Sequence, residues 1–278
     1  MSHYLAGKVV MVTGAGSGFG ALNSRKCAAG GAKIVGVDVN SAALDEVVAG
    51  IRAAGGEALA TVADVTDMVA VKAAANAAIE AYGAIDVLVN NAGVMPLAFF
   101  ADHERAWERW HKAIDINIKG VVNGIAAVYD QMMAQGRGQV VNISSIYGNG
   151  GIEGAGVYSA TKAAVTALSD ALRVEAQGRI KVTTVKPTGV LGTNLAGGIV
   201  NETAIVALAG QKGQLFVENL TNFMSGSLRP EQTDVDSVQY WLITPDDLAD
   251  AVVHVIDQPW GISLSDVTVR ASGENYIR

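Results

Sequence analysis

Short apolar runs alternate along the chain with alanine-rich segments of helical length. The runs stand at 9–12, 34–37, 58–62, 87–89, 140–143 and 182–185. They are continuously apolar rather than alternating between apolar and polar positions, which is typical of strands buried on both faces of a parallel sheet. Repeated strand–helix units imply right-handed crossovers. The pattern therefore predicts an α/β fold built on a doubly wound parallel sheet.

Capping residues predict where several helices begin. Ser41 is expected to cap a helix that extends through Ala54, and Asp67 stands where the next helix opens. Further along, Thr244 is followed by Pro245 and two acids, a sequence typical of a helix start. A last strand near 267–269 completes the predicted sheet.

The alternation breaks between residues 188 and 240. This stretch is rich in Gly, Asn and Thr and is too long for an ordinary connection in a compact domain. We expect it to form a substrate-binding loop or lid that carries short helices. No linker or internal repeat divides the chain, so residues 1–278 are expected to form a single domain with this segment inside it.

Composition narrows the choice of partners and compartment. The formal net charge is -7 and no run of Lys or Arg is present, which argues against nucleic acid as a partner. Cys27 is the only cysteine, so no intrachain disulfide can form and a reducing compartment is expected. Gly7-Lys8 interrupts the region where a signal peptide would need apolar residues. No apolar stretch is long enough to span a bilayer. We therefore expect a cytoplasmic protein without a membrane partner.

A glycine-rich turn follows the first predicted strand directly, in the run Thr13-Gly14-Ala15-Gly16-Ser17-Gly18-Phe19-Gly20. Glycines at such a turn let the backbone approach a pyrophosphate, which then sits at the positive end of the next helix. Because the turn joins a strand to a helix, it predicts a dinucleotide-binding site and hence a Rossmann fold. The residues expected to hold the nucleotide here are Gly14, Ser17, Gly18, Phe19 and Gly20.

Asp38 ends the second predicted strand about twenty residues beyond this turn. A carboxylate at that place accepts hydrogen bonds from the ribose hydroxyls of the adenosine. It would repel the 2′-phosphate of NADP, and Ser17 offers no compensating positive charge. The sequence therefore favours NAD as the cofactor.

With these motifs in place, the chain resembles the short-chain dehydrogenase/reductase family over nearly its whole length. The glycine spacing and the intact Asn90-Asn91-Ala92-Gly93 run match the family, and Asp64-Val65 matches the pair that lies along the adenine ring in its members. The resemblance implies cofactor contacts from Asp64, Val65, Asn91, Ala92 and Gly93, and further along the chain from Tyr158, Lys162 and Pro187. It also implies a homodimer or homotetramer. The residues around His103 and His111 form no set of metal ligands, so no metal is expected.

The same resemblance supplies four catalytic residues. Ser145 follows the fifth predicted strand, Tyr158 and Lys162 form the Tyr-x-x-x-Lys signature, and Asn117 occupies the family's asparagine position. Tyr158 would act as general acid/base and Ser145 would stabilise charge on the reacting oxygen. Lys162, four residues from Tyr158 on one helix face, would lower the pKa of the phenol and hold the nicotinamide ribose. Asn117 would hold a water that relays the proton.

One motif departs from the family pattern. After the sixth strand the family has Pro-Gly, then Val or Ile, then Thr, whereas this chain has Pro187-Thr188-Gly189-Val190-Leu191-Gly192-Thr193. Thr188 replaces the glycine, and one extra residue precedes Thr193. Aligned on Pro187, the motif places Val190 and Thr193 against the nicotinamide carboxamide. The extra residue leaves two alignments open, which differ by one position.

The substrate is expected over the nicotinamide, beside Ser145 and Tyr158. From their positions relative to the motifs, Met95, Ile146, Tyr147 and Leu195 are expected to form its wall. Further candidates are Pro96, Leu97, Phe99, Phe100 and Ile199. Such an apolar lining favours a hydrophobic or aryl secondary alcohol, or the matching ketone, as the small-molecule substrate. The sequence thus predicts an NAD-dependent alcohol dehydrogenase or ketone reductase. A lyase or epimerase that retains its NAD, and a non-catalytic NAD-binding scaffold, are the alternatives.

Overall fold

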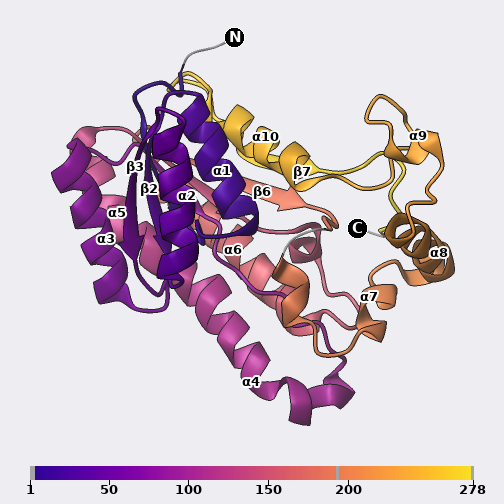
Figure 1. The fold of residues 1–278 in the computed structure, drawn as a ribbon. Coiled ribbons are helices and arrows are strands. Elements are labelled where there is room, and N and C mark those ends of the chain that lie inside the picture. The colour runs from indigo at the N-terminus through magenta and orange to yellow at the C-terminus, as the bar shows by residue number, and fades with distance from the viewer. Residues whose placement is uncertain (1–3, 192–193, 277–278) are drawn as a thin grey trace.

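The computed structural model describes residues 4–191 and 194–276. Within them, seven parallel strands form one sheet in the order β3-β2-β1-β4-β5-β6-β7 (Figure 1). The strands are β1 (Val9–Thr13), β2 (Lys33–Asp38), β3 (Glu57–Val62), β4 (Val87–Asn90), β5 (Gly138–Ile143), β6 (Ile180–Pro187) and β7 (Asp266–Val269). The chain order reverses between β1 and β4, and ligands of doubly wound sheets bind at such a switch point.

Helices cover both faces of the sheet. The larger ones are α1 (Gly18–Ala29), α2 (Ser41–Ala53), α3 (Met68–Tyr82), α4 (His103–Ile114), α5 (Gly120–Gln135), α6 (Gly156–Glu175), α8 (Gly213–Met224) and α10 (Pro245–Ile256). Residues of α1, α2 and α10 share one buried cluster with the sheet, and residues of α3, α5 and α6 share a second. The predicted doubly wound α/β fold with a single domain is therefore confirmed.

Two predicted helix starts are confirmed, and the cap of a third helix lies one residue earlier than predicted. Thr244 accepts a hydrogen bond from the Asp247 backbone N–H, and Asp67 caps α3 in the same way. Ser41, however, is the first helical residue of α2 rather than its cap. Asn40 precedes it in an extended conformation, and its side chain accepts from the Ala43 N–H, which is the capping geometry.

The stretch after β6 forms short helices rather than an open loop. It contains α7 (Thr203–Ala207), α8 and α9 (Pro230–Thr233), which lie together beside the sheet, on the side where the C-terminus also lies (Figure 1). Phe216 of α8 and Trp241 belong to an apolar cluster that also contains Tyr147 and Tyr276. This segment thus has a core of its own, packed against the carboxyl-end loops of the sheet.

None of the helices in the described part of the chain combines the length and the apolar character needed to cross a membrane.

Candidate active site

The turn between β1 and α1 depends on glycine at two positions. Gly14 has a positive φ of 67°, a conformation that side chains disfavour. A Cβ on Gly20 would lie 2.0 Å from the Gly14 carbonyl oxygen, so no side chain fits there. The turn and the first turn of α1 are therefore in contact, and the N-terminus of α1 faces the space above β1.

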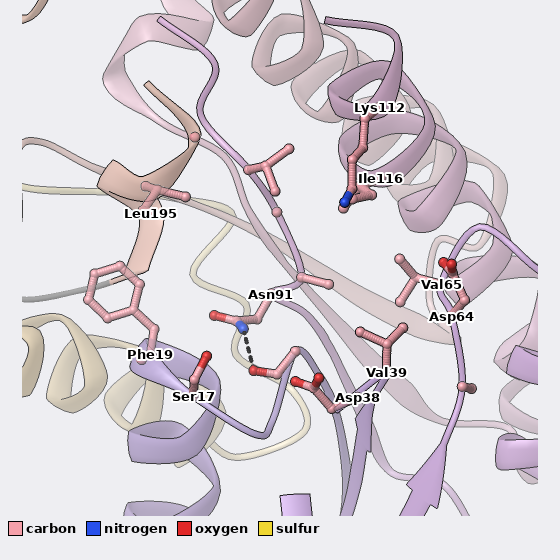
Figure 2. Close-up of a pocket in the computed structure, with 17 residues that line it drawn as sticks. Ser17, Phe19, Asp38, Val39, Asp64, Val65, Asn91, Lys112, Ile116 and Leu195 are labelled. Carbon is pink, nitrogen blue, oxygen red and sulfur yellow. Dashed lines mark hydrogen bonds between the residues drawn. The ribbon is translucent and has the colours of Figure 1, made fainter. Parts of the chain in front are cut away.

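The asparagine motif after β4 braces this turn. Asn91 donates from Nδ2 to the carbonyl of Thr13 at 2.9 Å. It also reaches the carbonyl of Gly14 at 3.4 Å, which is the dashed line at Asn91 in Figure 2. Its backbone N–H and that of Ala92 donate to the Thr13 hydroxyl at 3.0 and 3.1 Å. The two loops on either side of the switch point are thus held together by hydrogen bonds.

A groove of about 400 Å³ opens over these loops (Figure 2). Ten residues predicted to bind the nucleotide line it: Gly14, Ser17, Gly18, Phe19, Asp38, Asp64, Val65, Asn91, Ala92 and Gly93. Val39, Lys112 and Ile116 line it as well and were not predicted. Val39 and Ile116 are direct neighbours of the predicted residues Asp38 and Asn117, whereas Lys112 on α4 stands beside no motif. The groove runs from the glycine turn to Asp64, and the glycine cradle, the helix N-terminus and the flanking acids fit a dinucleotide.

Asp38 stands at one side of this groove with both carboxylate oxygens engaged. Oδ2 accepts from the Gly16 backbone N–H and Oδ1 from that of Asn40, each at 2.9 Å. Lys112 is the cation that lines the groove, and it projects from α4 beside Asp64 rather than toward Asp38 (Figure 2). The Thr66 backbone N–H is the main cause of the lowered pKa of Asp64, and Lys112 adds to it.

Other predicted cofactor residues lie outside the groove lining. Gly20 sits beneath the turn, while Pro187, Val190 and Tyr158 line a second cavity next to the groove. Thr193 lies outside the described residues.

Ser145 and Tyr158 meet at the carboxyl end of β5. Ser145 begins the turn after this strand, and its hydroxyl accepts from the Tyr147 backbone N–H at 3.2 Å. Tyr158 projects from the first turn of α6 and is 4% exposed. The Ser145 side chain lowers the pKa of Tyr158, against the larger opposite effect of burial.

Lys162 lies one turn further along α6, with its ammonium 5.9 Å from the centre of the Tyr158 ring. Nζ donates to the Ile143 carbonyl at 2.8 Å. It also lies 3.6 Å from where a Cβ on Gly93 would be, so the ammonium faces the asparagine motif that lines the groove.

The expected lowering of the Tyr158 pKa is not found in the protein alone. Burial raises the pKa of Tyr158 to about 12 and lowers that of Lys162 to about 8. Both shifts have the same cause. Burial removes water from the charged form of each group, the Tyr158 phenolate and the Lys162 ammonium, and therefore favours the neutral form. The prediction assumed an ammonium directed at the phenol, whereas the ammonium donates to the Ile143 carbonyl.

Asn117 lies in a π turn (Asp115–Lys119) between α4 and α5, a distortion that often marks functional sites. Its Oδ1 accepts from the Val94 N–H, and Nδ2 donates to the Val94 carbonyl, both at 2.9 Å. Nδ2 also donates to the Thr161 hydroxyl at 3.1 Å. Both N–H groups of the side chain are thus used within the protein, so the amide ties the asparagine loop to α6. The water relay stays a prediction, and it cannot rest on these N–H groups.

The second cavity measures about 150 Å³ and adjoins the groove, since Phe19 and Leu195 line both. It is largely apolar, and the predicted wall residues Met95, Tyr147 and Leu195 line it. Ile146 does not: its side chain is fully buried in the apolar cluster behind the wall. Successive residues of the turn after Ser145 point in different directions, so only Tyr147 reaches the cavity.

Several wall residues have no motif to mark them. They come from the last third of the chain: Ile205, Leu208, Phe216, Leu220 and Tyr276. The spacing of Phe216 and Leu220, four residues apart on α8, is the one signal that could have placed them on a shared helix face. Nothing in the sequence points to Tyr276, because its position depends on how the chain folds back after β7.

Comparison with known proteins agrees with this architecture. Residues 8–204 match the family model described as short chain dehydrogenase. An uncharacterized oxidoreductase of Listeria innocua is 35% identical over 94% of this chain and 95% of its own. A 2,5-dichloro-2,5-cyclohexadiene-1,4-diol dehydrogenase of Sphingobium indicum is 40% identical over 68% of this chain and 76% of its own. The chain therefore belongs to the short-chain dehydrogenase family and is an oxidoreductase of that type.

Solved structures lead to the same family. Levodione reductase superposes with a TM-score of 0.77 at 29% identity, covering 96% of this chain and 97% of its own. A short-chain dehydrogenase/reductase of Burkholderia phymatum in complex with NAD gives 0.74 at 28%, covering 95% and 89%. A metagenomic short-chain oxidoreductase in complex with NADP gives 0.72 at 28%, covering 96% and 98%.

Proposed function

We propose that this protein is an NAD-dependent alcohol dehydrogenase or ketone reductase acting on a hydrophobic or aryl secondary alcohol or ketone. One observation carries the proposal: Ser145 and Tyr158 both line an apolar cavity that adjoins a dinucleotide-shaped groove. A reacting carbon in this cavity can lie beside both a proton-transferring phenol and the nucleotide groove.

The residues suggest how the chemistry proceeds. Bound NAD supplies the hydride acceptor for alcohol oxidation, and its reduced form supplies the donor for ketone reduction. Tyr158 takes the proton of the alcohol hydroxyl during oxidation and returns it to the carbonyl oxygen during reduction. Ser145 donates a hydrogen bond to the same oxygen as negative charge develops on it. Lys162 provides positive charge beside the phenol and toward Gly93, where the nicotinamide ribose would lie.

The segment 188–240 is proposed as the wall and cover of the substrate cavity. Eight apolar residues of this segment line the cavity: Val190, Leu191, Leu195, Ile199, Ile205, Leu208, Phe216 and Leu220. Side chains of this kind favour an apolar substrate over a sugar, because unpaired hydroxyl groups would be desolvated at a cost.

Asp38 supports NAD rather than NADP. The relatives in complex with a nucleotide include one with NAD and one with NADP, so the choice depends on this chain's own residues. Asp38→Asn keeps an acceptor oxygen for the neighbouring N–H groups but removes the charge. We expect the ratio of kcat/KM with NAD to that with NADP to fall about tenfold, which corresponds to about 1.4 kcal/mol. Asp64→Asn, at the other side of the groove, is the matched control and should affect the two nucleotides equally.

Absorbance of reduced nicotinamide tests the proposal directly. NAD and NADP would be supplied in parallel with secondary alcohols from short aliphatic to bulky aryl. We expect turnover with NAD and a preference for apolar substrates. A nucleotide that is released only on denaturation and never consumed would contradict the proposal and favour the NAD-retaining lyase or epimerase, or the non-catalytic scaffold.

A further inference from the structure

The end of the chain contributes a side chain to the substrate cavity. Tyr276 lies seven residues beyond β7, yet its ring lines the apolar cavity and is 8% exposed. It reaches this place across Gly189, in the segment that departs from the family pattern. A Cβ on Gly189 would lie 1.8 Å from the Tyr276 hydroxyl oxygen and 2.2 Å from the ring carbon that bears it. Glycine is therefore the one residue type at position 189 that leaves room for the Tyr276 ring.

Neighbouring residues fix the end of the chain in place. Asn275, 5% exposed, accepts through Oδ1 from the Trp241 indole N–H at 2.7 Å and from the Asn219 amide at 3.1 Å. Glu274 accepts from Arg270 at 2.6 Å. Buried hydrogen bonds of this kind are costly to break, so the segment before Tyr276 is anchored rather than loosely laid on the surface.

The ring itself is held between two aromatic side chains. Its centre lies 5.4 Å from that of Phe216 on α8 and 6.2 Å from that of Tyr147, to which it is nearly perpendicular at 82°. These are favourable arrangements for aromatic pairs. Tyr276 thus fills the space between α8 and the turn that carries Ser145.

We propose that Tyr276 is a specificity-determining residue that sets the length of the substrate cavity and restricts the enzyme to substrates with a single ring or an apolar group of that size. This inference rests on the proposed function. The remaining cavity of about 150 Å³ matches the size of an apolar cavity that takes one benzene ring. It is below the range of about 300–1,000 Å³ that is typical of sites for larger ligands.

The test compares substrates of one and two rings. The probes are 1-phenylethanol and 1-(2-naphthyl)ethanol for turnover, and the matching ketones, acetophenone and 2-acetylnaphthalene, for binding by calorimetry with NAD present. Tyr276→Ala should raise kcat/KM for the naphthyl alcohol relative to the phenyl alcohol about tenfold or more, with a similar shift in the ratio of ketone dissociation constants. Tyr276→Phe is the matched control and should leave both ratios within about twofold of the wild type.

Gly189→Ala provides an independent route to the same result. Its methyl group would displace the tyrosine ring, so it should shift both ratios in the direction of Tyr276→Ala. In the double variant the glycine substitution should add little, because the ring it displaces is already absent. Additive shifts would contradict a shared cause.

The outcomes separate this inference from the proposed function. Unchanged ratios in Tyr276→Ala would overturn the inference even if the wild type oxidises both alcohols. A shift in ketone binding without turnover of any alcohol would support the role of Tyr276 in the cavity and overturn the proposed activity instead.

Discussion

Tyr158→Phe is expected to lower kcat/KM by about 10² to 10⁴, the range that a positioned general acid/base contributes. The phenol is buried and lines the apolar cavity together with Ser145, and the substitution removes only the hydroxyl that moves the proton. Nucleotide binding should be retained, because Tyr158 does not line the groove. Steady-state kinetics together with a nucleotide titration would measure both effects.

Tyr129→Phe is the matched control for this variant. The Tyr129 ring packs against the core on the opposite side of the sheet from the groove's glycine turn, and its hydroxyl has no proposed part in the reaction. Near wild-type turnover by Tyr158→Phe would show that another group transfers the proton and would contradict the assigned role.

The pH profile should differ between the two directions of the reaction. Oxidation needs the phenol without its proton, and burial raises the pKa of Tyr158 to about 12 in the protein alone. We therefore expect the rate of alcohol oxidation to rise with pH through the alkaline range. Ketone reduction needs the protonated phenol and should not rise in that range. An oxidation rate that is level from pH 7 to 10 would argue against Tyr158 as the base.

Lys162→Met is expected to lower kcat/KM by at least about 100-fold while making the folded protein more stable at pH 7. Burial lowers the pKa of Lys162 from 10.5 to about 8, a difference that corresponds to about 3 kcal/mol. Losing the hydrogen bond to Ile143 offsets about 1 kcal/mol of this gain. The free energy of unfolding should therefore rise by about 1–3 kcal/mol in denaturant titrations.

The stability gained by Lys162→Met should decrease as the pH rises from 8 to 10.5. Between pH 8 and 10.5 the unfolded chain binds the Lys162 proton more strongly than the folded protein does, so wild-type stability rises with pH there. The advantage of the methionine variant should shrink over the same window. Lys72→Met, on the exposed face of α3, is the control and should change stability by less than about 0.5 kcal/mol. A variant less stable than the wild type at pH 7 would contradict the argument.

The sheet and the nucleotide groove could be predicted because their signals are local. Buried parallel strands read as continuous apolar runs, and the glycine turn requires its residue types through backbone geometry. The capping error at Ser41 has a similarly local reason. Asn40 and Ser41 are both good caps, and backbone conformation alone decides between them.

The substrate cavity was less predictable because its walls come from distant parts of the chain. Tyr276 reaches the site only through the path after β7, and Ile146 turns into the core although Tyr147 lines the cavity. The side-chain partners of Asn117 depend in the same way on how α6 packs against the asparagine loop. Such contacts depend on tertiary packing, which no residue spacing encodes.

The origin of the two cavities in different parts of the chain bears on how new specificities can arise. The groove is built almost wholly from residues before Ile116, whereas most walls of the apolar cavity follow β6. Recombination between relatives at the end of β6 would therefore exchange most of the substrate cavity as one block and keep most of the nucleotide groove. Residues that line a cavity from the other side of this junction would have to be matched across such a chimaera. They include Met95, Leu97 and Tyr147 in the apolar cavity, and Leu195 and Gly198 in the groove.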